Sequence, residues 1–179
     1  MTAIMAQVLR TAVPSWKPTA DMVLSTLMRH TDRAQNLVLA PVSLFGLGLV
    51  IAGTLLRWKC FQRMGSQFTA ALTIRKDHKL ITTGPYSFVR HPSYSGGVAV
   101  NFGLACWLCS RGSWVRESGV LDTMAGSVFF YILALCMGTL TTLGLRRMAR
   151  EDRELRRVFG DEWDGWARRV RYSLIPGVY

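Results

Sequence analysis

The residues best suited to chemistry are concentrated in residues 84–94, Gly-Pro-Tyr-Ser-Phe-Val-Arg-His-Pro-Ser-Tyr. This stretch combines a Gly-Pro turn, two tyrosines, an Arg-His pair and a second proline, and a long uncharged run follows it. Ionisable groups at the edge of a bilayer are costly to desolvate and are usually kept for a function. The stretch is therefore the first candidate for a functional site.

A second group of candidates lies in the densely charged segment after residue 145. Arg147 and Glu151 are four residues apart, as are Arg150 and Glu154, so each pair shares one helix face. Such pairs are also common as solvated surface ion pairs, which add little stability. The residues alone leave both interpretations open.

The histidines His78 and His91 are flanked by basic residues. Each is either a hydrogen-bonded structural residue or part of a site. No HExxH spacing occurs and nearby carboxylates are scarce, so we expect no metal site. The sequence also lacks a P-loop and a dinucleotide-binding glycine fingerprint, which excludes the common nucleotide-dependent classes.

Three apolar segments must position these residues: 34–56, 92–110 and 122–145. Each reaches or approaches the ~20 residues that cross hydrocarbon as a helix. Half of the chain is hydrophobic and only 18% is charged. Three buried helices of this kind in a soluble protein would need a much larger polar shell. We therefore predict an all-α, multi-span transmembrane protein with at least three spans.

The 179 residues suffice for one domain, which we place at 34–179, with a charged tail from residue 146. The preceding segment, 1–33, contains two apolar runs, 1–13 and 20–29. These runs form either interfacial helices or the remnant of a further hairpin.

The net charge of +11 first suggests nucleic acid as a partner. However, the basic residues gather between the first two spans and again after the third, at the ends of the apolar segments. That distribution follows the positive-inside rule and places both basic regions in the cytosol, against anionic lipid headgroups. We expect membrane lipid as a partner and no nucleic acid.

Local signals predict where several helices begin and end. His91 should be non-helical and Pro92 the first helical residue of the second span. The third helix should continue out of the membrane through Arg157 and stop at Phe159-Gly160. A short amphipathic helix should follow, and its Trp163 and Trp166 suit a membrane interface. In the first span, the glycines should allow close helix approach; they are Gly46, Gly48 and Gly53.

Residues 75–94, with the GPY and RHPSY motifs, closely resemble the core of isoprenylcysteine carboxyl methyltransferases. The tail resembles the same family from Arg147 to Glu151, in Phe-Gly-Asp-Glu-Trp at 159–163 and in Arg-Val-Arg at 169–171. The resemblance covers roughly residues 37–179 and preserves the order of span, motif, hairpin and charged tail. It implies a multi-pass methyltransferase of the endoplasmic reticulum membrane, which acts in CaaX processing and has its active site facing the cytosol.

The resemblance also implies a cofactor, S-adenosyl-L-methionine, in a pocket formed by the inter-span motif and the C-terminal helix. The positions that match cofactor contacts are His78, Lys79, Leu80, Ile81, Tyr86, His91, Pro92, Ser93, Tyr94 and Glu151. Arg147 matches the arginine that binds the substrate carboxylate, which we treat as its catalytic role. Ala70-Ala71 departs from the family pattern, which has a polar cofactor contact there.

The implied reaction is methyl esterification of the C-terminal carboxylate of a prenylated cysteine in a protein. A carboxylate is already ionised at neutral pH, so the reaction needs alignment and exclusion of water more than a strong base. Two alternatives remain: a membrane methyltransferase for another lipid acceptor, such as a phospholipid amine, and a non-catalytic membrane scaffold. Arg147 favours an anionic acceptor.

Overall fold

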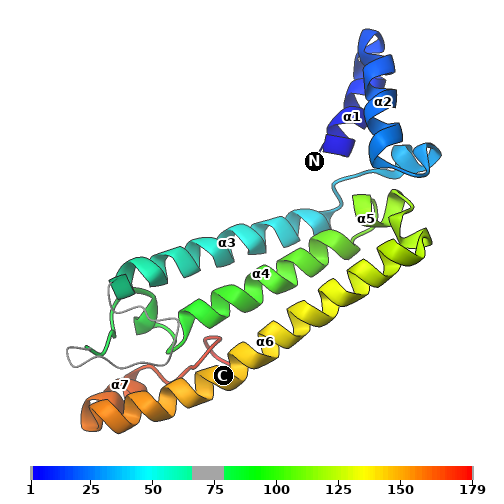
Figure 1. Ribbon diagram of the computed structural model, residues 1–179. Coiled ribbons are helices and arrows are strands. Elements are labelled where there is room, and N and C mark those ends of the chain that lie inside the picture. Colours follow the sequence, from blue (N-terminus) through cyan, green and yellow to red (C-terminus); the bar gives the residue numbers. More distant parts are fainter. Residues whose placement is uncertain (1, 66–78, 179) are drawn as a thin grey trace. The chain divides into compact units, whose positions relative to one another are not determined.

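The computed structural model describes residues 2–65 and 79–178, and its regular secondary structure in those ranges is entirely helical (Figure 1). This confirms the expected all-α class. The α-helices are α1 (Thr2–Ala12), α2 (Lys17–Leu27), α3 (Pro41–Met64), α4 (Pro92–Cys109), α5 (Trp114–Glu117), α6 (Met124–Phe159) and α7 (Asp161–Arg169). The 3₁₀ helices are η1 (Pro14–Trp16), η2 (Thr31–Asn36), η4 (Gly84–Ser87) and η5 (Val120–Asp122). The chain divides into two compact units: Met1–Gly48 with Phe102–Met137, and Leu49–Asn101 with Gly138–Tyr179.

Two helices of the described chain, α3 and α6, are long and apolar enough to cross a membrane. They have 24 and 36 residues, and none of the most apolar window of α6 is buried. Large side chains such as Phe129, Ile132 and Leu135 are exposed along α6. An exposed apolar surface of this size is typical of contact with lipid, so the chain has the character of a membrane protein.

The expected second span corresponds to α4, which has 18 residues and no charge. It is not among the two helices that meet the hydropathy criterion for a span. Its first two turns, Pro-Ser-Tyr-Ser-Gly-Gly, are polar or small, and Asn101 lies in its middle. A third span at α4 therefore stays a prediction.

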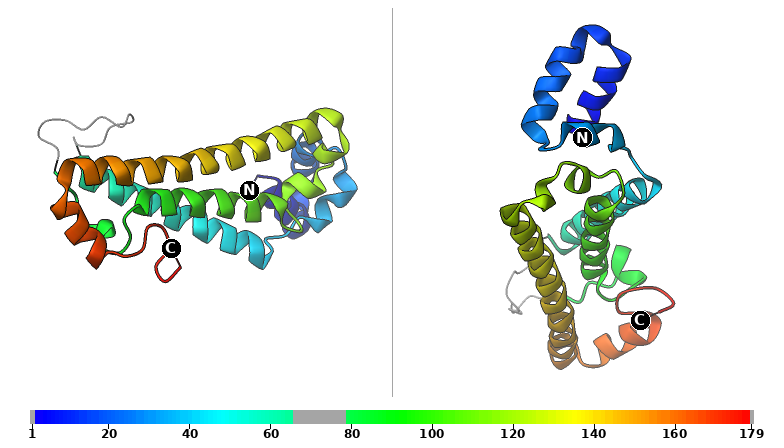
Figure 2. Two further views of the ribbon diagram at one scale, coloured as in Figure 1. Left: turned by 90° about the horizontal axis from the view of Figure 1, so that it is seen from below. Right: turned by 90° about the vertical axis from the view of Figure 1, so that its right-hand side faces the viewer.

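In the first unit, α1 and α2 pack as a helical hairpin (Figures 1 and 2). Its core includes Ala6, Leu24 and Met28. The hairpin is tied to the connection after α4, since the indole N–H of Trp114 donates to the Leu27 carbonyl oxygen at 2.9 Å. The segments 1–13 and 20–29 thus form a packed pair of helices. Both sequence interpretations, interfacial helices and the remnant of a further hairpin, stay predictions.

The prolines fix two of the helix starts. The first long helix begins at Pro41, whereas the charge-free segment begins at residue 34. Proline disfavours a helical residue directly before it but fits the first helical turn. The second helix begins at Pro92, as predicted.

The charged end of the third long helix also follows the prediction. Helix α6 continues to Phe159 without interruption, and Gly160 has a φ of +48°, in the left-handed region that glycine adopts without strain. Helix α7 then turns away from α6 (Figure 2).

Close helix approach is confirmed at two of the three predicted glycines. A Cβ added at Gly46 would lie 2.6 Å from the Gly103 carbonyl oxygen, and one at Gly53 would lie 2.6 Å from the Gly96 carbonyl oxygen. The prediction is wrong for Gly48, where a Cβ would meet nothing within 4 Å. The physical reason is helical periodicity: Gly46 and Gly53 are seven residues apart and share one face, whereas Gly48 points elsewhere.

Candidate functional site

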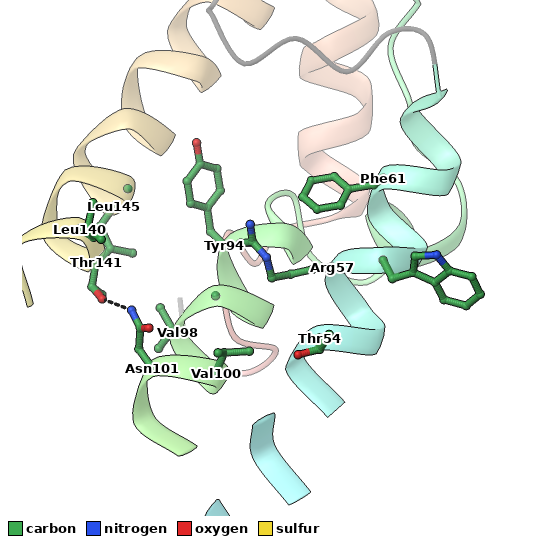
Figure 3. Close-up of a pocket in the computed structure, with 13 residues that line it drawn as sticks. Thr54, Arg57, Phe61, Tyr94, Val98, Val100, Asn101, Leu140, Thr141 and Leu145 are labelled. Carbon is green, nitrogen blue, oxygen red and sulfur yellow. Dashed lines mark hydrogen bonds between the residues drawn. The ribbon is translucent and has the colours of Figure 1, made fainter. Parts of the chain in front are cut away.

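Within the second unit, a cavity of about 610 Å³ is lined by α3, α4 and α6 (Figure 3). Its walls combine aliphatic side chains, such as Val98 and Leu140, with polar ones. Tyr94 and Arg57 line it on the side of the sequence motif, and Asn101 donates to the Thr141 hydroxyl at 2.7 Å on another side. A mostly apolar space with a few convergent polar groups is typical of a ligand site.

Glu151 connects the motif to the charged helix. Its Oε1 accepts hydrogen bonds from the Tyr94 hydroxyl at 2.9 Å and from the Arg147 Nε at 3.0 Å. The bond to Arg147 uses Nε, so the two terminal guanidinium nitrogens of Arg147 take no part in it. The other carboxylate oxygen, Oε2, is 3.8 Å from His91 Nδ1, beyond hydrogen-bond distance. Within residues 2–65 and 79–178, Oε2 of Glu151 therefore retains acceptor capacity.

His91 is buried, with 6% of its surface exposed, between two neighbouring acids of α6. Its Nε2 forms a 2.8 Å hydrogen bond with Asp152 Oδ1. A carboxylate can only accept, so Nε2 carries the proton in this bond. The ring also meets the edge of Tyr94, with centroids 5.8 Å apart. This arrangement suits a residue that orients the Glu151 and Asp152 carboxylates.

The segment after α7 holds the motif in place. The backbone N–H groups of Arg90 and His91 donate to the carbonyl oxygens of Tyr172 and Ser173, each at 2.9 Å. The Arg90 guanidinium also donates to the carbonyl oxygens of Val170 and Arg171 at 3.3 and 3.0 Å, and to the Ser173 hydroxyl. The position of His91 therefore depends on residues about 80 positions later in the chain.

Helix α7 packs on the Gly-Pro-Tyr turn. Trp166 is 3% exposed, and its indole N–H donates to the Tyr86 carbonyl oxygen at 3.2 Å. The Trp163 ring lies near the guanidinium groups of Arg90 and Arg156, with the two carbons 6.0 and 5.9 Å from the ring centroid. The two tryptophans, which the sequence predicted for a membrane interface, thus contact protein groups of the site.

The side chain of Tyr86 is half-buried. Burial raises its pKa, helped by a hydrogen bond with the Cys60 thiol and by the negative charge of Glu151. A raised pKa keeps the phenol protonated at physiological pH. Tyr86 is therefore a neutral group that forms a hydrogen bond with the Cys60 thiol and lies within electrostatic range of Glu151.

The structure brings together five of the predicted site residues, Tyr86, His91, Tyr94, Arg147 and Glu151. Four others lie elsewhere in the described segments. Lys79, Leu80 and Ile81 lie in the segment before the turn, Lys79 exposed and the other two half-buried, while Pro92 is completely buried. The carbonyl oxygen of Ser93 accepts from Arg57 at 3.1 Å. His78 and Ala70-Ala71 lie outside the described residues.

The sequence analysis missed three residues with clear roles: Arg57, Arg90 and Asp152. Asp152 had a signal, because it directly follows Glu151 and lies one turn from Met148, which is buried. Arg57 was counted only as a charge that flanks the membrane, and Arg90 was noted as part of the motif but given no role of its own. Their partners are distant in sequence, so no local pattern distinguishes them from such charges.

These features define a class: a helical membrane protein in which acidic, aromatic and basic side chains converge where apolar helices become charged. A family model, "Isoprenylcysteine carboxyl methyltransferase (ICMT) family", matches residues 46–157. The chain belongs to this family.

Individual relatives agree with this placement. A protein-S-isoprenylcysteine O-methyltransferase B of Arabidopsis thaliana is 32% identical over 139 residues, which are 76% of this chain and 60% of the relative. A protein of Oryza sativa subsp. indica, named "Probable protein-S-isoprenylcysteine O-methyltransferase", is 33% identical over 74% of this chain and 61% of its own length. The chain thus spans about 60% of the length of these relatives.

The similarity extends beyond methyltransferases. A delta(14)-sterol reductase of Schizosaccharomyces pombe is 28% identical over 59% of this chain, but over only 20% of its own length. No solved structure matches the chain.

Proposed function

We propose that this chain transfers the methyl group of S-adenosyl-L-methionine to the C-terminal carboxylate of a prenylated cysteine in a protein. Family membership and the printed names of the plant relatives support this reaction. The observation that carries it is the chain of hydrogen bonds from Tyr94 through Glu151 to Arg147, next to a cavity between apolar helices. Such a site can serve a polar cofactor and a lipid-bearing acceptor together.

The donor set fits the proposed cofactor. Glu151 has an oxygen with unused acceptor capacity, which suits an ammonium or a ribose hydroxyl. Tyr94 lines the cavity, and aromatic rings attract cations such as a sulfonium. When bound, the cofactor supplies the electrophilic methyl group. The residues that would hold it are Tyr86, Tyr94 and Glu151, with His91 as the residue that orients the acids; contacts from His78, Lys79, Leu80, Ile81, Pro92 and Ser93 remain part of the proposal.

Arg147 would bind the acceptor carboxylate. Its Nε is fixed by Glu151, and its two terminal nitrogens can form a planar, two-pronged contact with a carboxylate. Because the acceptor is already ionised, the chain's contribution is alignment and removal of water rather than proton transfer.

A phospholipid amine is the second candidate acceptor, since it would use the same cofactor and the same kind of cavity. Arg147 disfavours it, because a cation beside the acceptor position repels a protonated amine. A non-catalytic scaffold would need none of the connected polar groups. The similarity to a sterol reductase shows that related sequences occur in proteins of other names, so the acceptor has to be measured.

We also propose three spans, α4 included, in the endoplasmic reticulum membrane, with the site facing the cytosol. The supporting observation is that basic residues gather in the segment between α3 and α4 and again after the apolar part of α6. In oriented membranes, cysteines introduced at Ser87 and Arg168 should react with an impermeant thiol reagent from the cytosolic side. One at Arg116, between α4 and α6, should react from the opposite side. Labelling of Ser87 and Arg168 from different sides would contradict the shared site.

The reaction itself is tested in membranes that contain the chain, with labelled S-adenosyl-L-methionine and two acceptors, N-acetyl-S-farnesylcysteine and phosphatidylethanolamine. We expect a base-labile methyl ester on the first and no methylation of the second. Methylation of the amine alone would establish the alternative acceptor. Cofactor binding without any transfer would leave only a binding function.

A further inference from the structure

The cavity is lined by an arginine, Arg57, that is distinct from Arg147, the arginine that the family resemblance assigns to the acceptor. Arg57 projects from α3 towards α4 and lies near Tyr94 (Figure 3). Its terminal nitrogen donates to the Ser93 carbonyl oxygen at 3.1 Å, and its guanidinium carbon is 5.4 Å from the centroid of the Phe61 ring. Arg147 does not line this cavity.

Two glycines of α4 make room for the Arg57 side chain. A Cβ added at Gly96 would lie 2.8 Å from Arg57 Cγ, and one at Gly97 would lie 3.0 Å from a terminal nitrogen. The first contact is closer than real Cβ atoms show, and the second is tighter than most. Larger residues at these positions would force the guanidinium out of its place. The local structure of α4 therefore fits an arginine at this point of the cavity.

Arg57 has no counter-charge in the part of the chain that the structure describes. Its interactions there are the Ser93 carbonyl and the Phe61 ring, and no carboxylate forms an ion pair with it. A half-buried cation in a mostly apolar cavity is costly without an anion. By contrast, Arg147 forms an ion pair with Glu151 through its Nε. Among the described residues, Arg57 is thus a cation of the cavity lining that no carboxylate pairs with.

Tyr94 connects the two arginines. Both guanidinium groups lie within electrostatic range of its hydroxyl, which is bonded to Glu151. The two arginines also have corresponding places in the sequence. Arg57 is the first charged residue after the first apolar segment, and Arg147 is the second after the third. An anion at Tyr94 would therefore be held from two sides.

We propose that Arg57 is a specificity-determining residue that selects a carboxylate over an amide or an amine at the head of the lipid acceptor. This inference rests on the proposed function. A carboxylate in the cavity gains a charge-assisted hydrogen bond with Arg57, whereas a protonated amine is repelled by it. Arg147 then serves the same carboxylate from the side of Glu151.

The test compares two lipids that differ only in the head group, N-acetyl-S-farnesylcysteine and its carboxamide. Their dissociation constants are measured in nanodiscs for the wild-type chain and for Arg57→Gln, Arg57→Lys, Gly97→Ala and Lys59→Gln. Lys59 is an exposed cation on the same helix, so Lys59→Gln controls for loss of positive charge. Cofactor binding and methyl transfer are measured in parallel.

The wild-type chain should bind the carboxylate more tightly than the carboxamide. In Arg57→Gln this preference should fall about tenfold or more, the scale of one charge-assisted hydrogen bond. The KM for the carboxylate acceptor should rise as this preference falls, while kcat and the affinity for the cofactor stay close to wild type. Arg57→Lys should retain part of the preference, Gly97→Ala should lose part of it because the guanidinium is displaced, and Lys59→Gln should be unchanged.

An unchanged preference in Arg57→Gln, or an equal loss in Lys59→Gln, would overturn the inference. So would a loss of cofactor affinity that matches the loss of acceptor affinity, because that indicates a purely structural role. Failure of the proposed function gives a different result: no methyl transfer by the wild-type chain. The binding preference can still be measured in that case.

Discussion

Removal of the Glu151 carboxylate should weaken cofactor binding far more than removal of any neighbouring acid. In the structure its Oε1 serves Tyr94 and Arg147, and its Oε2 is available to a ligand. A hydrogen bond to a charged group contributes about 1.5–3 kcal/mol. Glu151→Ala should therefore raise the Kd for S-adenosyl-L-methionine about 10- to 160-fold. Glu151→Gln keeps the shape and one acceptor oxygen, so its Kd should lie between those of the wild-type chain and Glu151→Ala.

Calorimetry in detergent measures this effect directly, and Glu154→Ala is the matched control. Glu154 lies one turn further along α6 and pairs with Arg157, an exposed residue, at 2.9 Å. The control should bind the cofactor like the wild-type chain. Thermal unfolding of each variant separates a lost contact from a lost fold. Wild-type affinity in a folded Glu151→Ala protein, or equal losses at the two positions, would refute the reasoning.

Two further predictions concern Arg147 and the glycines of α3. Arg147→Lys keeps the charge but loses the planar guanidinium, so acceptor-dependent methyl transfer should fall, and fall further in Arg147→Ala, with cofactor binding largely retained. The same changes at Arg150, which is exposed, should be mild; equal, mild losses at both positions would exclude a substrate role for Arg147. Gly46→Ala should lower the free energy of unfolding in detergent by about 1–3 kcal/mol, because its Cβ would meet the backbone of α4. Gly48→Ala should have little effect, and the reverse order would contradict the packing described.

The features that the sequence predicted well are those that local sterics decide. Pro92 starts α4 because proline fits a first helical turn and disfavours helix before it. Gly160 ends α6 because it adopts a positive φ without strain. The pairing of Arg147 with Glu151 follows from their spacing on one helix.

The features that the sequence did not predict depend on contacts between distant segments. Glu154, spaced like a partner for Arg150, forms its ion pair with Arg157 instead, and side-chain spacing alone cannot choose between the two. Arg57 could not be distinguished from a membrane-flanking charge, because its place is set by Gly96 and Gly97 on another helix. Likewise, no residue near Trp166 in the sequence indicates that its indole donates a hydrogen bond to the Gly-Pro-Tyr turn.

The most direct test of the central claim is acceptor-dependent methyl transfer by the wild-type chain in membranes, with N-acetyl-S-farnesylcysteine and phosphatidylethanolamine supplied in parallel. The account predicts formation of a base-labile methyl ester on the prenylcysteine, saturable in S-adenosyl-L-methionine and reduced in Glu151→Ala. Methylation confined to the phospholipid amine, or ester formation that is unaffected in a folded Glu151→Ala protein, would contradict it.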